Sequence, residues 1–317
     1  MDEISFISGR DRCAAWHFDA NGDAFAGARG VPCVVMAPGF AGTRDTRALM
    51  DYARGFAAGG LHVVLFDYRG FGGSGGSPRQ LVSAARQRRD YRGAIAAARQ
   101  LPSVDPERIV LWGISLSGGH VVRAAAEDGR IAAVVALTPA IDGVTALARL
   151  ARTVGIRHLL RTAAHGVRDA QRAMTRGRPH LVPMVGARGS RAIFAIDGAE
   201  QDYTDVAGPS WRNEVCARTA LEVAFNRPIT FAARVRCPLL VQAGTEDRIA
   251  PLATARRAAA RAGAHAELRE YPIDHVDVYT ETAHQRILAD QLDFLDRHLS
   301  PIGSRRDPNT SAEWSHW

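Results

Sequence analysis

The chain has 317 residues, of which 46% are hydrophobic and 23% charged, and its formal net charge is +7. Every one of its 40 basic residues is an arginine, and the absence of lysine excludes Schiff-base enzymes, lysine-containing phosphate-binding loops and Ser-Lys dyads. Such a composition is typical of a globular chain that buries a sizeable core in one or two domains.

Short apolar runs and helical stretches alternate along most of the chain. Residues 4–18 have the pattern of antiparallel edge strands. The apolar runs that follow do not alternate with polar residues, which is typical of parallel strands covered on both faces. We expect these strands at Cys33–Ala37, Val63–Asp67, Ile109–Gly113, Val134–Thr138 and Leu239–Ala243, with a further short strand at Glu267–Tyr271. We expect helices at Asp45–Ala58, Ala84–Gln100, Ser117–Asp128, Pro251–Ala262 and Ala283–Leu299. This alternation predicts an α/β fold with right-handed crossovers.

One long insert, between Pro139 and Pro238, interrupts the alternation. An insert of this length usually forms a functional lid. We therefore predict a core made of residues 1–140 and 236–300, a cap at 141–235, and a loose C-terminal tail at 301–317. The cap is expected to be largely helical because several apolar residues recur at intervals of three and four: Leu147, Leu150, Val154, Leu159 and Leu160.

The positive charge is concentrated in the predicted cap. Residues 141–235 hold fourteen arginines against eight acidic residues, and the stretch Arg149–Arg191 holds ten arginines against Asp169 alone. One interpretation is a solvated helix face. The other is a basic lid that attracts an anionic substrate or the phosphates of a carrier-bound acyl group.

The motif that carries most information about chemistry is Gly113-Ile-Ser115-Leu-Ser117-Gly-Gly119, placed between a buried strand and a helix. It resembles the nucleophile elbow, G-x-S-x-G, of the α/β-hydrolase fold, in which the turn is so tight that only small residues fit two places before and after the nucleophile. Ser117 stands where the pattern has its second glycine, so a frame with Ser117 as nucleophile also stays open. Gly113 favours Ser115, and a plain capped helix start is the alternative without chemistry.

The resemblance implies the remaining members of a catalytic triad, which follow in the order serine, acid, histidine. Asp247 lies in Gly244-Thr-Glu-Asp-Arg-Ile-Ala-Pro251, which is similar to the acid loop of the family, and His275 stands ahead of the final predicted helix. Glu246 and Asp142 remain alternative acids. The resemblance also implies an oxyanion hole formed by the backbone N–H groups of Leu116 and Phe40.

A glycine-rich run, Gly70-Phe-Gly-Gly-Ser-Gly75, formally matches a dinucleotide-binding loop, with Asp90 at the spacing of its acidic residue. Ser77-Pro78 interrupts the helix that such a loop requires. The longer segment Asp67–Ser74 instead resembles the D-x-R-G-x-G-x-S turn that is common in α/β hydrolases, so no cofactor is expected there.

The chain thus resembles the dienelactone-hydrolase and serine-aminopeptidase-like branches of the α/β hydrolases. The resemblance implies a serine hydrolase that cleaves a carboxylic ester or thioester of a small-molecule acyl substrate, without a metal or organic cofactor. An amidase, an acyltransferase and a hydrolase-fold binding protein are the alternatives.

We expect no nucleic-acid or membrane partner. A cytoplasmic location is expected because residues 1–3 lack the features of a signal peptide and the four cysteines lack paired spacing.

Overall fold

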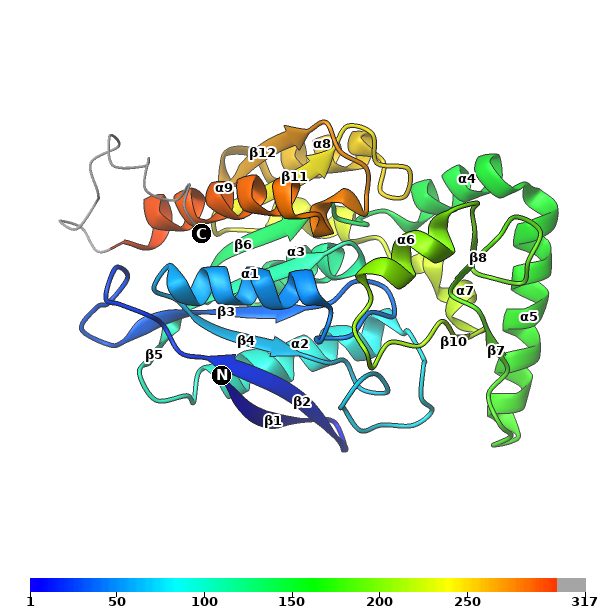
Figure 1. The fold of residues 1–317 in the computed structure, drawn as a ribbon, viewed down its shortest axis with the longest axis horizontal. Coiled ribbons are helices and arrows are strands. Elements are labelled where there is room, and N and C mark those ends of the chain that lie inside the picture. Colours follow the sequence, from blue (N-terminus) through cyan, green and yellow to red (C-terminus); the bar gives the residue numbers. More distant parts are fainter. Residues whose placement is uncertain (301–317) are drawn as a thin grey trace.

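The computed structural model describes residues 1–300, so the predicted C-terminal tail at 301–317 lies outside the described residues. An eight-stranded sheet with the strand order β1-β2-β4-β3-β5-β6-β11-β12 forms its centre (Figure 1). Its first two strands run antiparallel to their neighbours and the other strands are parallel. The strands are β1 (Asp2–Ser8), β2 (Asp11–Phe18), β3 (Val31–Ala37), β4 (His62–Phe66), β5 (Val104–Ile114), β6 (Ile131–Leu137), β11 (Leu239–Gly244) and β12 (Ala266–Tyr271).

Helices cover both faces of this sheet, and each face has its own apolar core. On β3, Val34 and Met36 belong to one core while Cys33 and Val35 belong to the other, which explains why the strand does not alternate in polarity. The helices α1 (Arg47–Ala58) and α9 (Glu281–Leu299) lie on one face, and α2 (Ala84–Ala98), α3 (Leu116–Glu127) and α8 (Leu252–Ala262) lie on the other (Figure 1). The predicted fold class and the predicted sheet elements are confirmed, with small shifts at their ends.

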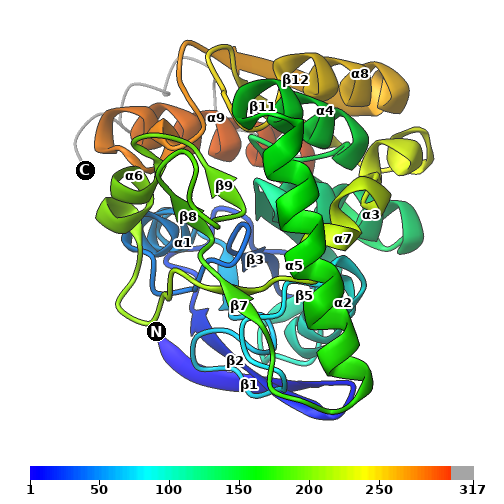
Figure 2. The ribbon, with the colours of Figure 1, turned by 90° about the vertical axis from the view of Figure 1, so that its right-hand side faces the viewer.

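A mostly helical segment lies across the end of the sheet at which the parallel strands finish (Figures 1 and 2). We call this segment, residues 141–227, the cap. Its helices are α4 (Gly143–Val154), α5 (Ile156–Met174), α6 (Ala199–Val206), α7 (Thr219–Glu222) and the 3-10 turn η1 (Val223–Phe225). Two short ladders join β7 (Leu181–Val182) to β10 (Val215–Cys216) and β8 (Val185–Gly186) to β9 (Phe194–Ala195).

The helical pattern predicted around residues 147–160 is divided into two helices. Gly155, with φ +86°, ends α4 and begins α5, and glycine adopts such a backbone conformation without strain. The turn η2 (Pro228–Arg234) falls inside the interval predicted for the cap, but it packs against α3 and α8 beside the sheet. The remaining turns are η3 (Gly263–His265) and η4 (Asp277–Tyr279). Within residues 1–300, no helix combines the length and apolar character needed to cross a bilayer.

Candidate active site

Ser115 lies in the sharp turn between β5 and α3, at the end of the sheet that faces the cap. Its backbone has φ +55° and ψ −118°, a conformation that costs energy for a residue with a side chain and is typical of functional sites. The turn requires glycine at position 113, because a Cβ there would lie 2.3 Å from the carbonyl oxygen of Ser117. Ser115 occupies the N-cap position of α3, but its side chain forms no capping hydrogen bond.

Ser117, the other serine of the motif, is fully buried and holds the neighbouring loop in place. Its hydroxyl donates a hydrogen bond to the carbonyl of Pro38 and lies 2.5 Å from the hydroxyl of Tyr68. A hydroxyl has one proton to donate, so Tyr68 must be the donor to Ser117. The serine at this position therefore links the elbow to the loop after β3, a role that glycine could not fill.

Three residues far apart in the sequence form one hydrogen-bonded chain. The Nε2 atom of His275 lies 2.9 Å from Oγ of Ser115, and its Nδ1 lies 2.7 Å from Oδ2 of Asp247. The second oxygen of Asp247, Oδ1, accepts hydrogen bonds from the N–H groups of Ile249 (2.7 Å) and Ala250 (2.6 Å). All three side chains are buried, so their mutual orientation is fixed by the loops that carry them.

Neither of the two alternative acids is hydrogen-bonded to the imidazole of His275, whose Nδ1 faces Asp247. Glu246 is exposed, and Asp142 pairs with Arg227 at 2.9 Å and with Arg257 at 3.5 Å. Burial raises the pKa of Asp142, but the hydrogen bonds from Arg227 and Thr145 and the charge of Arg227 outweigh it and hold the pKa below its usual range. Asp142 therefore acts as an anchor at the start of the cap rather than as a partner of His275.

The loop after β3 passes close to Ser115. A Cβ on Gly39 would lie 3.2 Å from Cβ of Ser115, so glycine allows this close approach. Phe40 follows directly, and Leu116 is the first residue of α3, where a backbone N–H has no acceptor within the helix. Within residues 1–300, neither the Phe40 N–H nor the Leu116 N–H has a hydrogen-bond partner. Both N–H groups are thus without an acceptor in the described residues.

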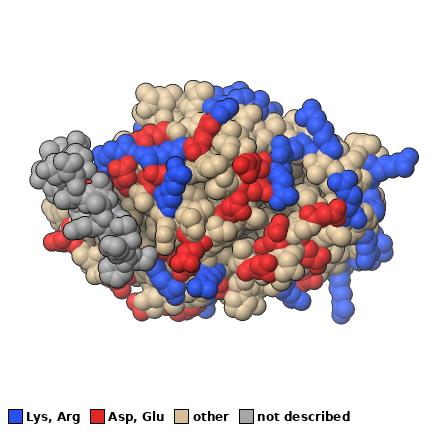
Figure 3. All heavy atoms as spheres, turned by 45° about the horizontal axis from the view of Figure 1, so that its top comes forward, with Lys and Arg blue, Asp and Glu red and all other residues tan. Residues whose placement is uncertain are grey.

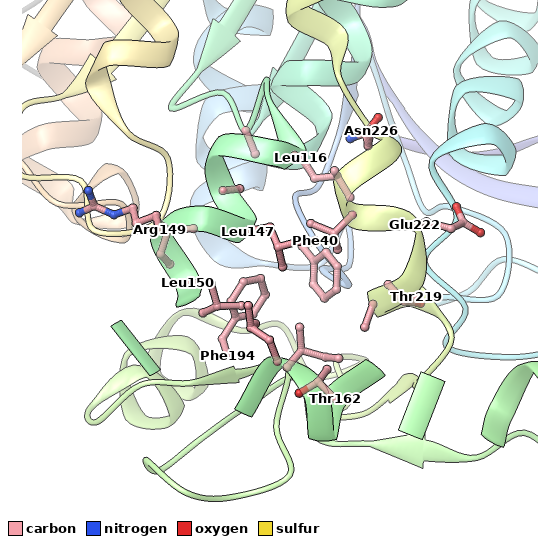
Figure 4. Close-up of a pocket in the computed structure, with 18 of the residues that line it drawn as sticks. Phe40, Leu116, Leu147, Arg149, Leu150, Thr162, Phe194, Thr219, Glu222 and Asn226 are labelled. Atoms are coloured by element: carbon pink, nitrogen blue, oxygen red, sulfur yellow. The ribbon is translucent and has the colours of Figure 1, made fainter. Parts of the chain in front are cut away.

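A cavity of about 360 Å³ is lined by Ser115 and extends into the cap. Its wall is mostly apolar, with a few polar residues such as Thr162 and Asn226 (Figure 4). Phe40 and Phe194 meet edge to face in its centre, with ring centroids 5.3 Å apart. Leu147 and Leu150 of α4 point toward these rings, whereas the charged end of Arg149 points away (Figure 4). Other apolar residues that line the cavity are Leu116, Leu159, Leu160, Ile193, Ile196 and Ile249.

Arg149 ties the cap to the loop that carries Asp247. Its Nε donates to the carbonyl of Arg248 at 2.7 Å, and its Nη2 donates to the carbonyl of Asp247 at 3.1 Å. Arg248 in turn pairs with Asp274, next to His275. Neither arginine was singled out in the sequence, because nothing in the local pattern around Arg149 indicates which loop it meets.

On the other side of Ser115 the space is much smaller, about 30 Å³. His275, Tyr203, Trp211 and Tyr279 line this second cavity. The two tyrosines and the tryptophan come from the cap and from η4, and their approach to Ser115 was not visible in the sequence. Such a volume holds little more than one or two water molecules.

The glycine-rich turn after β4 is closed by its own contacts. A Cβ on Gly72 would lie 2.3 Å from Oδ2 of Asp67, so the carboxylate fills the space that a phosphate would need. Asp67 also accepts hydrogen bonds from the N–H groups of Arg44 and Gly73, and its burial raises its pKa to about 6. Asp90, the acid that a dinucleotide site would use, binds Nε of Arg69 at 2.6 Å instead.

The outer surface of the cap is basic. Six arginines project from α5 or the turn after it, and the edge of the molecule formed by the cap shows several arginine side chains (Figure 3). They are Arg157, Arg161, Arg168, Arg172, Arg176 and Arg178. Asp169, the one acidic residue among them, is buried and binds the N–H groups of His180 and Arg218. It lies near the side chain of Arg218, at 3.6 Å, and pairs with none of the six.

Comparison with known proteins agrees with this fold. The family model for serine aminopeptidases of the S33 type matches residues 31–274. The chain is 33% identical to the quorum-quenching protein AidA of Acinetobacter baumannii strain MDR-ZJ06, over 93% of this chain and 94% of AidA. It is 38% identical to the thiohydrolase aneE of Aspergillus aculeatus over 38% of each chain. The crystal structure of the α/β hydrolase GrgF from Penicillium has a TM-score of 0.78 at 24% identity, covering 94% of this chain and 98% of GrgF. The chain therefore belongs to the S33 serine aminopeptidase family of α/β hydrolases.

Proposed function

We propose that this α/β hydrolase cleaves a carboxylic ester or thioester through an acyl-enzyme on Ser115. The supporting observation is the hydrogen-bonded chain from Ser115 through His275 to Asp247 at the floor of an apolar cavity. His275 takes the proton of the Ser115 hydroxyl as the hydroxyl attacks the carbonyl, and then gives it to the leaving group. Asp247 keeps the proton of the imidazole on Nδ1, so that Nε2 is free to act as the base.

In this proposal the negative charge that develops on the substrate oxygen is bound by the N–H groups of Phe40 and Leu116. Within residues 1–300 these two N–H groups have no other hydrogen-bond acceptor, which supports their role as an oxyanion hole. Water then attacks the acyl-enzyme, again with His275 as the base. A non-catalytic binding protein would have no need for the strained backbone of Ser115 or for two unpaired N–H groups beside it.

The shape of the site favours a substrate with an apolar acyl group. The larger cavity has mainly aromatic and aliphatic walls. The four charged residues that line it are engaged by other groups: Arg149 by backbone carbonyls, Glu222 by the hydroxyl of Ser83, Asp142 by Arg227 and Arg248 by Asp274. An apolar acyl chain in this cavity gains about 0.8 kcal/mol for each buried methylene group. A charged or peptide-like acyl group would leave its polar atoms unpaired there.

Transfer of the acyl group to an alcohol is the second candidate. The chain is 37% identical to the polyketide transferase grgF of Penicillium over 35% of this chain, which supports this alternative. The small volume beside His275 and Trp211 favours water over a bulky acceptor. Adding alcohols of increasing size to an esterase assay and measuring the partition between acid and ester products separates the two reactions.

The experiment that tests the proposal compares Ser115→Ala with Ser117→Ala on a panel of chromogenic acyl esters and acyl thioesters. Ser115→Ala should abolish the acylation burst and reduce turnover to the background rate. Ser117→Ala removes a bond to the loop of Phe40 but leaves the nucleophile, so it should lower the rate without abolishing the burst. A wild-type rate in Ser115→Ala would refute the proposal.

A further inference from the structure

A pair of buried histidines faces a carboxylate that has no arginine partner, far from Ser115. His17 lies near the end of β2, His62 is the first residue of β4, and Asp19 follows β2. Because β2 runs antiparallel to β4, these residues meet at the edge of the sheet where the parallel strands begin, opposite the elbow. The proposed reaction uses none of them.

The distances within this cluster are those of a ligand set for a metal ion. Nε2 of His17 lies 3.2 Å from Nδ1 of His62, and Oδ1 of Asp19 lies 3.8 Å from Nδ1 of His62. Two ligands of a tetrahedral zinc ion are about 3.3 Å apart, given metal–ligand distances of about 2.0–2.1 Å. The imidazole pair already has this spacing, and Oδ1 of Asp19 lies about half an ångström farther than this from Nδ1 of His62. From Nδ1, the other nitrogen of the His17 ring, the same oxygen lies 3.9 Å away. Asp19 is 66% exposed, so it has room to move and leaves a path for an ion.

Two further observations indicate that the cluster suits a cation. The rings of His17 and His62 are both buried, and one ring nitrogen of each faces the other. In a chain with 40 basic residues, Asp19 forms no ion pair with any arginine of residues 1–300. The carboxylate and the two imidazole rings therefore lie together, with no arginine in contact with the carboxylate.

We propose that His17, His62 and Asp19 bind a divalent transition-metal ion, for which Zn²⁺ is the best match. Two imidazoles and one carboxylate, completed by water, are ligands that zinc accepts in tetrahedral geometry. Within residues 1–300, no other group of three histidine, cysteine or acidic side chains brings its ligand atoms this close together. The ion joins the segment after β2 to the start of β4, so its effect is on stability rather than on the reaction at Ser115.

The test uses tag-free full-length protein, dialysed against a chelator and titrated with Zn²⁺ by calorimetry, with Co²⁺ absorption as a second readout. We expect one ion per chain and a higher unfolding temperature with Zn²⁺. Asp19→Asn keeps the fold, because Asp19 is exposed, and should weaken binding by about tenfold or more. His62→Gln should have at least the same effect. His180→Gln is the matched control.

The control is informative because His165 and His180 in the cap form a second imidazole pair, with nitrogens 2.9 Å apart. That pair is not part of a three-ligand group. His180→Gln should therefore leave the affinity and the stoichiometry unchanged. Absence of Zn²⁺ binding, or binding that survives both Asp19→Asn and His62→Gln, would overturn the proposal and leave the His17–His62 contact as a plain hydrogen bond.

Discussion

Replacing Asp247 by asparagine tests how the acid acts on His275. Oδ1 of Asp247 accepts two backbone N–H groups, at 2.7 and 2.6 Å, so the oxygen of the asparagine must stay on that side. The NH₂ group is then directed at Nδ1 of His275, where the carboxylate now lies at 2.7 Å. The imidazole must accept at Nδ1 and carry its proton on Nε2, which prevents Nε2 from taking the proton of Ser115.

The size of the effect follows from this change of tautomer. A triad with the wrong histidine tautomer loses about 10⁴-fold in kcat, which corresponds to about 5 kcal/mol of transition-state stabilisation. The fold should persist, because the side chain keeps its shape and its backbone hydrogen bonds. The assay is kcat with a chromogenic ester, with thermal unfolding as the check on structure. Glu246→Gln, at the exposed neighbouring acid, is the matched control and should keep nearly full activity. An Asp247→Asn variant that stays within tenfold of the wild type would show that Asp247 does not orient the base.

Three other outcomes follow from the cavity, the cap and the core. With unbranched acyl esters, kcat/KM should rise about fourfold for each added methylene group until the cavity is full. Leu150→Trp should shift the acyl length with the highest kcat/KM to shorter acyl chains. A kcat/KM that does not change with acyl length would contradict the assigned acyl cavity. If the arginines of the cap attract anionic substrates, kcat/KM for anionic esters should fall with salt more steeply than for neutral esters, and equal salt responses would reject this role. Burial lowers the pKa of His120 to about 3, so the unfolded chain binds a proton below about pH 6.5 that the folded protein does not. Between pH 7.5 and pH 5 the wild type should therefore lose about 2 kcal/mol of unfolding free energy relative to His120→Gln, as measured by urea unfolding, and parallel pH profiles would argue against a neutral buried His120.

The sheet was predictable because its signals are local. Several strands contain an uninterrupted apolar run, such as Cys33–Ala37 of β3 between two prolines, and the covering helices show helical spacing of their apolar residues. The elbow was predictable for a similar reason, since Gly113 and Ser115 must stand at fixed spacing in a tight turn. Asp247 and His275 could be named only through the resemblance to α/β hydrolases, because no local pattern shows that their loops meet.

The cap was much less predictable, because long-range contacts decide its form. The apolar spacing of Leu147, Leu150 and Leu159 predicted helix but not the break at Gly155, nor that these residues would line a cavity rather than a core. The approach of Trp211 and Tyr203 to His275 depends on the loop after α6, whose Ser210 N–H binds Asp45 just before α1. Ser117 is an intermediate case, since its small size was foreseen while its bond to Pro38 was not.

The most direct test of the central claim is to trap the acyl-enzyme and locate it. The protein is mixed with a slowly hydrolysed acyl ester, quenched in acid within the burst phase and digested for peptide mass spectrometry. The account predicts one acyl group per chain, attached to Ser115, and none in Ser115→Ala. An acyl group on Ser117, or turnover without any covalent intermediate, would contradict it.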